Sequence, residues 1–193
     1  MRRIAPLIAL LGLAGCAELG LGTPTHTRSG SDAPQKTAQP KGQPGQPQIA
    51  LSKTRGARGQ AIPVTATLRT GGQRIAGTQN DIGFDARQAG IAAQANGKPD
   101  CRANPAIGKE GTAFSFLPKG CRPPACKQVR ALVLSLSDVA PIPDGAVLYT
   151  CTVTIAANAA PGSQGLSANR VGFSSPAGEA IQGGVVNGSI LIQ

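Results

Sequence analysis

The sequence predicts an all-β protein, a nine-stranded antiparallel β-sandwich that follows a flexible N-terminal segment. Three observations support this fold class. Residues 147–155 alternate between apolar and polar side chains with a period of two, which is typical of a half-buried strand. The chain of 193 residues contains 26 glycines and 16 prolines, which favours many short strands with frequent turns. No segment carries a convincing helical spacing of apolar residues.

Two segments, residues 129–136 and 147–155, form the centre of the predicted fold. In the second segment, the odd-numbered positions from Val147 to Ile155 lie on one side and threonines occupy most of the other, with Leu148 as the exception. The first segment is apolar on both faces, which is typical of a strand covered on both sides or nearly so. A proline-rich loop with a Pro-Asp-Gly turn joins the two strands.

Seven further strands complete the predicted nine. Turns such as Gly71-Gly72 and Pro161-Gly162 separate them and supply the backbone conformations that tight connections need. Within the last strand, Asn187-Gly188 predicts a bend or a small hairpin. These seven strands are predicted at residues 49–52, 62–69, 75–85, 89–95, 113–117, 166–173 and 185–192.

Residues 1–15 have the layout of a lipoprotein signal peptide. Arg2 and Arg3 precede a short apolar run, which is too short to span a bilayer as a helix. The Leu-Ala-Gly-Cys sequence ending at Cys16 resembles the bacterial lipobox, and this resemblance implies that Cys16 is the lipidated first residue of the mature chain. We therefore expect an exported lipoprotein, anchored through Cys16 to the outer membrane or cell surface. An ordinary secretion signal with an incidental cysteine is the alternative.

Residues 16–48 predict a disordered or extended linker. Prolines alternate there with Gln, Lys, Ser and Gly, and almost no apolar residue could join a core. The single histidine of the chain, His26, lies in this linker. A His-dependent catalytic triad or a His-bearing metal site is therefore excluded from the domain that follows, which is predicted to span residues 49–193. The linker would hold this domain off the membrane.

The charge of the chain is basic but dispersed. Nineteen Lys and Arg against nine Asp and Glu give a net charge of +10, and only 3% of the residues are aromatic. Nucleic-acid interfaces usually combine basic clusters with aromatic side chains that stack on bases, so we expect no nucleic-acid binding. A solvated cationic surface, or loose attraction to acidic polysaccharide or anionic lipid, fits this pattern better.

Four cysteines remain when Cys16 is set aside, and an even number in an exported chain predicts two disulfides. Three pairings are open. We favour Cys101–Cys151, which would join two neighbouring strands, and Cys121–Cys126, which would close a short proline-containing loop. A zinc site is disfavoured because the chain has no Cys-x-x-Cys pair and no histidine in the domain. We expect no metal and no cofactor.

Several stretches together resemble a cohesin domain. Residues 76–85 begin with Ala-Gly and end with an aromatic residue followed by Asp, and residues 144–148 resemble the Asp-Gly-x-Leu start of a late cohesin strand. Residues 59–64 resemble the early Gly-Gln-x-Val-x-Val-Pro strand, and the closing residues 188–192 also fit. The resemblance covers residues 49–193. It implies a nine-stranded jelly-roll sandwich related to carbohydrate-binding modules.

Cohesins bind the dockerin modules of polysaccharide-degrading enzymes, mainly through one sheet face. By this resemblance, the face would include the predicted strands 75–85 and 129–136, with Gln79, Asn80 and Asp81 as candidate binding residues. The four cysteines of the domain, and an insertion at residues 96–111, depart from the cellulosomal pattern.

We expect a monomeric, non-catalytic, surface-anchored module whose partner is a dockerin-like protein module, with a link to polysaccharide binding or breakdown. Direct carbohydrate binding and a purely structural envelope lipoprotein are the alternatives. An enzyme is disfavoured because the domain has no histidine, no nucleophile motif and few acids. Asp81 and Asp85 could form a catalytic carboxylate pair, but Asp85 would equally serve to cap the turn after its strand.

Overall fold

The computed structural model describes residues 45–193. The predicted signal peptide, the lipidation site Cys16 and most of the predicted linker therefore lie outside the described residues. The sandwich begins inside the predicted linker range, because its first strand starts at Gln48 and the backbone N–H of Gly184 donates a hydrogen bond to the carbonyl oxygen of Pro47 (2.8 Å).

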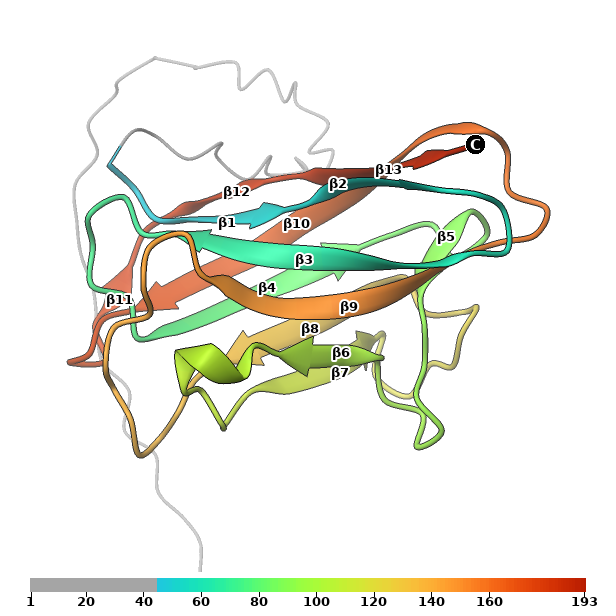
Figure 1. Ribbon diagram of the computed structural model, residues 1–193. Coiled ribbons are helices and arrows are strands. Elements are labelled where there is room, and N and C mark those ends of the chain that lie inside the picture. Colours follow the sequence, from blue (N-terminus) through green and yellow to red (C-terminus); the bar gives the residue numbers. More distant parts are fainter. Residues whose placement is uncertain (1–44) are drawn as a thin grey trace, which may run out of the picture. The chain divides into compact units, whose positions relative to one another are not determined.

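Two β-sheets face each other and enclose one hydrophobic core (Figure 1). Apart from one turn of 3-10 helix at Pro105–Ile107, all the regular secondary structure of residues 45–193 is β-strand. The strands are β1 (Gln48–Leu51), β2 (Lys53–Gly56), β3 (Ala61–Arg69), β4 (Gly77–Gly83), β5 (Ala89–Ile91), β6 (Cys101–Ala103), β7 (Ala113–Leu117), β8 (Gln128–Val133), β9 (Val147–Ile155), β10 (Gly162–Ser174), β11 (Ala180–Ile181), β12 (Gly184–Val186) and β13 (Gly188–Ile192).

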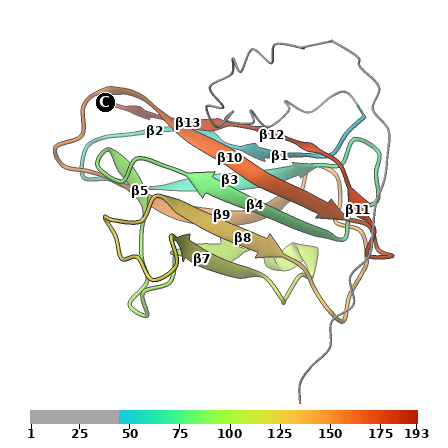
Figure 2. The ribbon, with the colours of Figure 1, turned by 180° about the vertical axis from the view of Figure 1, so that it is seen from behind.

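The six-stranded sheet has the order β12-β1-β3-β9-β5, with β6 also paired to β9, and the seven-stranded sheet has the order β2-β13-β10-β4-β8-β7, with β11 paired to β10. Figure 2 shows the seven-stranded sheet from its outer side, with β10, β4, β8 and β7 in front. The predicted all-β class is confirmed. The jelly-roll topology stays a prediction.

Residues 45–193 form thirteen strands where the sequence predicted nine. The additional strands are short. β2 covers Lys53–Gly56 and β6 covers Cys101–Ala103, and the sequence predicted neither strand. The polar composition of β2 is explained by its position at the edge of the seven-stranded sheet, where charged side chains are common because they discourage pairing with other chains.

The N-terminal and C-terminal strands each pass from one sheet to the other. Ser52 separates β1 from β2, and Asn187 separates β12 from β13, which confirms the predicted bend at Asn187-Gly188. β1 pairs with β12 and β2 pairs with β13 in parallel, so the sandwich is not purely antiparallel as predicted. The two crossings touch. A Cβ atom on Gly188 would lie 2.5 Å from the carbonyl oxygen of Ser52, so this close approach requires glycine.

A β-bulge explains why Leu148 breaks the alternation of residues 147–155. In the pairing of β3 with β9, Ala66 faces Tyr149 but Thr67 faces Val147, so Leu148 is an extra residue in the register. A bulge turns the extra side chain out of the regular alternation. Leu148 is fully buried here, like Tyr149 beside it.

Strand β8 is shorter and less covered than the sequence suggested. It ends at Val133 rather than at residue 136, and only its inner face, with Val129, Ala131 and Val133, is fully buried. Leu132 points to the outer side and is half-buried, whereas Leu136 lies beyond the strand and is exposed. The expected coverage of both faces, or nearly both, is therefore corrected, because among residues 45–193 no second layer packs on the outer side of this strand.

Both favoured disulfides are present. Cys101 and Cys151 are register partners on β6 and β9, with their Cα atoms 4.0 Å apart. Cys121 and Cys126 close the short loop before β8, with Cα atoms 5.4 Å apart. The first disulfide fastens the three-residue strand β6 to the centre of the six-stranded sheet, which confirms the pairing favoured from the sequence.

Candidate functional site

The two strands expected to form a binding face, β4 and β8, are neighbours in the middle of the seven-stranded sheet. In their register, Asp81 faces Arg130 and Gly83 faces Gln128. Along the same row, Asp81 also faces Asn169 of β10. These residues point to the outer side of the sheet because side chains alternate between the two faces of a strand. The four strands β10, β4, β8 and β7 thus form one continuous outer surface.

A buried carboxylate lies at the centre of this surface. The side chain of Asp81 is 0% exposed, although it points outward, because arginine side chains cover it. Arg130 donates from Nε to Oδ1 (2.7 Å) and from Nη2 to Oδ2 (2.9 Å). Such a bidentate arrangement fixes the guanidinium in one orientation, and the hydrogen bond with Asp81 raises the pKa of Arg130 above its ordinary value.

A second arginine approaches the same carboxylate from β10. Nε of Arg170 lies 3.8 Å from Oδ2 of Asp81. Arg170 has a φ of 48° and lies where the register of β10 with β4 shifts between Asn169 and Gly172. A bulge of this kind redirects the side chain that it carries. Here it turns Arg170 towards the aspartate of the neighbouring strand.

The outer surface is hollowed next to this charge cluster. A shallow groove of about 860 Å³ runs beside it. Its floor has small residues, and a Cβ atom on Gly83 would clash with Oγ of Ser167, so glycine at this position allows the serine to lie across β4. The groove is lined by Asp81, Gly83, Phe84, Asp85, Leu117, Pro118, Lys127, Gln128, Arg130, Gly165, Ser167 and Arg170.

A second, smaller hollow lies at the other end of β4 and β8. Its volume is about 240 Å³, and Gln79, Leu132 and Leu134 are among its lining residues. The outer surface of the seven-stranded sheet therefore has two shallow hollows, one towards each end of β4 and β8, rather than one deep pocket.

The three candidate residues Gln79, Asn80 and Asp81 do not share one face. Gln79 and Asp81 point outward, whereas Asn80 is 0% exposed and points into the core beside Tyr149. The prediction that Asn80 belongs to a binding face is therefore corrected. The signal was present in the sequence, since Asn80 has the same parity as Ile82, an apolar residue that must face the core.

The charge cluster contains two residues that the sequence analysis did not select. Arg130 is a single charged residue inside an otherwise apolar run, and its parity with Leu132 places it on the outer face. That pattern could have identified it. No sequence signal marks Arg170, because its position depends on a bulge that forms only when β10 pairs with β4.

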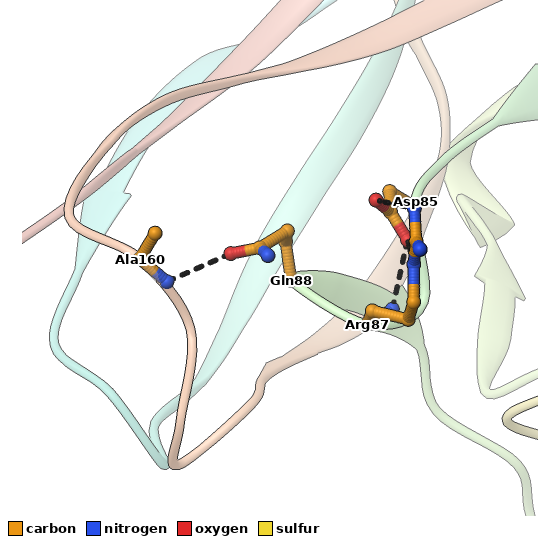
Figure 3. Close-up of polar contacts among 4 residues, drawn as sticks. All are labelled: Asp85, Arg87, Gln88 and Ala160. Carbon is orange, nitrogen blue, oxygen red and sulfur yellow. Dashed lines mark hydrogen bonds and ion pairs between the residues drawn. The ribbon is translucent and has the colours of Figure 1, made fainter.

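Asp85 caps the turn that follows β4, which is the alternative role predicted for this residue from the sequence. Its Oδ1 accepts hydrogen bonds from the backbone N–H of Arg87 (3.0 Å) and from its Nε (3.1 Å), as Figure 3 shows. The first of these contacts is backbone capping, and the side-chain bond is the main reason why the pKa of Asp85 is lowered. In the same view, Gln88 accepts a hydrogen bond from the backbone N–H of Ala160 (2.8 Å).

Asp81 and Asp85 line the same groove but differ in exposure, since the side chain of Asp81 is 0% exposed and that of Asp85 is 42% exposed. Each carboxylate is also bound by an arginine of its own, Arg130 or Arg87.

Within residues 45–193, no group of three or more His, Cys, Asp or Glu side chains is arranged to hold a metal ion. The same part of the chain contains no helix with the length and apolar character needed to cross a membrane.

The arrangement of strands matches solved cohesin structures. CaCohA2 of Clostridium acetobutylicum, in complex with a variant of CaDoc0917, matches with a TM-score of 0.63 and 14% identity over 76% of this chain and 99% of that chain. The sixth cohesin of scaffoldin B from Acetivibrio cellulolyticus, in complex with a Cel5 dockerin, matches with a TM-score of 0.61 and 16% identity over 77% of this chain and 99% of that chain.

A non-cellulosomal cohesin from the archaeon Archaeoglobus fulgidus matches with a TM-score of 0.57 and 11% identity over 77% of this chain and 91% of that chain. No family model and no curated protein matches the sequence. At these identities the likeness shows the fold. The chain has the cohesin fold, as the motifs in its sequence implied.

Proposed function

We propose that this protein is a non-catalytic docking module that binds a dockerin-like protein partner through the outer surface of strands β10, β4, β8 and β7, here called the docking face. The observation that carries the proposal is the cohesin fold, which extends over nearly the whole of cohesins solved in complex with dockerins. The partner chemistry of those proteins is transferred to this chain as a hypothesis.

The docking face has properties that suit protein binding. No other strand of residues 45–193 covers it, and it carries two shallow hollows. Its central side chains are already fixed by the bidentate bond between Arg130 and Asp81. A surface whose side chains are ordered before binding loses less conformational entropy when the complex forms. This rigidity favours docking of a complementary surface.

The proposal includes the location of the module. Lipidation at Cys16 would anchor the chain to the outer membrane or cell surface, the linker at residues 16–48 would space the domain away from it, and the partner would belong to polysaccharide binding or breakdown. Intact-mass measurement of the mature protein tests the anchor, since an unmodified Cys16 would exclude it.

Direct carbohydrate binding is less well supported than protein docking. Sugar-binding surfaces usually stack sugar rings on exposed aromatic side chains. Among the described residues, Phe116, Tyr149 and Phe173 are buried, and Phe84 and Phe114 are partly buried against the core. The docking face therefore offers no open aromatic platform for a sugar ring.

The experiment that tests the proposal compares the two outer faces of the sandwich. Full-length protein is immobilised and incubated with the exported proteins of the source organism, as the wild type, as Ser167→Tyr on the docking face and as Thr154→Tyr on the outer face of the six-stranded sheet. Both positions are exposed hydroxyl residues, so the two substitutions add similar bulk.

We expect a dockerin-like protein to be retained by the wild type and by Thr154→Tyr but lost with Ser167→Tyr. Equal retention by both variants would show that another surface binds the partner. Retention of glycans without any protein would favour direct carbohydrate binding instead.

A further inference from the structure

The loop at residues 134–140, which follows β8, presents two aliphatic side chains to solvent. Leu136 is 92% exposed and Val139 is 54% exposed, and Leu191 is the third large hydrophobic residue exposed among residues 45–193. Single exposed aliphatic side chains are common on protein surfaces. Two of the three on one short loop concentrate apolar surface at a single point.

A buried lysine holds the second half of this loop. Lys109 is 3% exposed, and its Nζ donates hydrogen bonds to the carbonyl oxygens of Asp138 and Ala140, both at 2.8 Å. Burial of an ammonium group is unfavourable unless hydrogen bonds compensate it. The two carbonyl groups flank Val139, so the lysine fixes the backbone on both sides of this exposed residue.

A carboxylate holds the first half of the loop. Oγ of Ser135 donates to Oε1 of Glu110 (2.6 Å), and Oγ of Ser137 donates to the same oxygen. Oγ of Ser135 also accepts from the backbone N–H of Asp138 (2.9 Å). These contacts flank Leu136, and the serine hydroxyls lower the pKa of Glu110 to about 2, so the carboxylate is charged at neutral pH.

The clamped loop continues the docking face. Leu134, its first residue, lines the smaller hollow together with Gln79 and Leu132. A partner that covers this hollow therefore comes next to Leu136. Because Lys109 and Glu110 already order the loop, its immobilisation in a complex costs little additional conformational entropy.

We propose that Leu136 and Val139 form a second contact of the docking interface, in which both side chains insert into an apolar recess of the protein partner. This inference rests on the proposed docking function and adds to it the chemistry of the partner surface. Continuity with the docking face selects a protein partner as the occupant, rather than a second copy of the chain or a lipid surface.

The first test uses a photocrosslinking residue in the full-length protein. p-Benzoylphenylalanine replaces Ser115, Leu136 or Leu191 in separate samples, each of which is irradiated with the exported proteins of the source organism. Ser115 is an exposed residue of β7 and the register partner of Arg130, so it lies on the docking face. Leu191 is the matched control, because it is an exposed leucine on β13, separated from β8 by β10 and β4. We expect positions 115 and 136 to form adducts with the same protein and position 191 to form none.

The other outcomes distinguish failure of the loop contact from failure of the docking function. Adducts at position 115 without adducts at position 136 would overturn the loop contact and leave the docking function standing. Adducts of position 136 with a second copy of the chain would also overturn it. Absence of adducts at both positions would remove the docking function itself.

The second test measures affinity for the crosslinked protein after it has been purified. Full burial of one aliphatic side chain changes a binding constant by about tenfold or more. We therefore expect at least a tenfold loss for Leu136→Ser with Val139→Ser, and a change within about twofold for Leu191→Ser. Equal losses in both would show that general surface hydrophobicity, rather than the clamped loop, drives binding.

Discussion

The hydroxyl of Tyr149 on β9 donates a 2.9 Å hydrogen bond to Oδ1 of Asn80 on β4, and this bond joins the two sheets across the core. Both residues are 0% exposed. The ring of Phe114 packs edge-on against that of Tyr149, with ring centroids 5.3 Å apart. Burial raises the pKa of Tyr149, so the hydroxyl stays protonated and remains a donor.

We expect Tyr149→Phe to destabilise the fold, because it leaves Oδ1 of Asn80 buried without its donor. An unsatisfied buried polar group costs about 1–3 kcal/mol. Nδ2 of the same Asn80 already has no hydrogen-bond partner among the described residues, which leaves little to compensate the loss. Urea unfolding of the full-length protein measures the free-energy difference.

The control for this prediction removes both partners. Tyr149→Phe combined with Asn80→Leu replaces the polar pair by apolar groups of similar shape, and this can be nearly neutral. The double variant should therefore be more stable than Tyr149→Phe alone. If the double variant is the less stable of the two, the hydrogen bond does not explain the effect.

A second prediction concerns the charge cluster of the docking face. Arg130→Met would leave the buried carboxylate of Asp81 without its bidentate partner. Loss of one member of a fully buried ion pair costs about 3–5 kcal/mol. The side chain of Arg130 is 36% exposed, so water replaces part of the interaction, and we expect about 2 kcal/mol in chemical denaturation.

Adding Asp81→Asn to Arg130→Met should restore part of this stability, because it removes a buried carboxylate that would keep only the more distant Arg170 beside it. Thermal or urea unfolding of the single and double variants provides the comparison. An equal loss in both variants would mean that packing of the arginine stem, rather than its charge, stabilises the sheet.

The two disulfides should contribute unequally. Cys101–Cys151 closes a sequence separation of 50 residues, and Cys121–Cys126 closes one of 5. Loop-closure entropy then predicts a loss of about 4 kcal/mol for Cys101→Ala with Cys151→Ala, against about 2 kcal/mol for Cys121→Ala with Cys126→Ala. Unfolding curves of the two paired variants test this order. Equal losses would indicate that constraint of the unfolded chain is not the main contribution.

Local sequence patterns predicted those strands in which the alternation of apolar and polar residues matches the burial of the two faces. The alternation in residues 147–155 gave a strand with the bounds of β9, and residues 113–117 gave β7. Such strands can be recognised in the sequence because one face packs on the core and the other does not, so apolar and polar side chains alternate. The edge strand β2 was missed because it is polar and is held by its parallel pairing with β13, which has no signal in neighbouring residues.

The residues of the candidate site likewise divide into those that local sequence patterns identify and those that they do not. Asp81 was selected correctly as an outward-pointing residue, and parity alone could have excluded Asn80 and included Arg130. The position of Arg170 depends on a register shift between two strands distant in sequence. The clamp of the loop at residues 134–140 likewise joins segments about 25 residues apart, so neither could be derived from local spacing.

The loop clamp should weaken in acid. Hydrogen bonds from the hydroxyls of Ser135 and Ser137 lower the pKa of Glu110 from its ordinary 4.5 to about 2. Because the folded-state pKa is depressed, the contribution of Glu110 is fully present above about pH 4.5 and is lost as the pH falls through about 2. We expect the loop, and not the sandwich core, to loosen in this range.

Hydrogen exchange between about pH 5 and about pH 2 checks this expectation. The backbone N–H groups of Ser137 and Asp138, which donate to Oγ of Ser135, should lose protection in the wild type, whereas that of Val153 in β9 should keep it. In Glu110→Gln the loop amides should be weakly protected at every pH. Protection that falls in the same way in both proteins would assign the change to other carboxylates and not to Glu110.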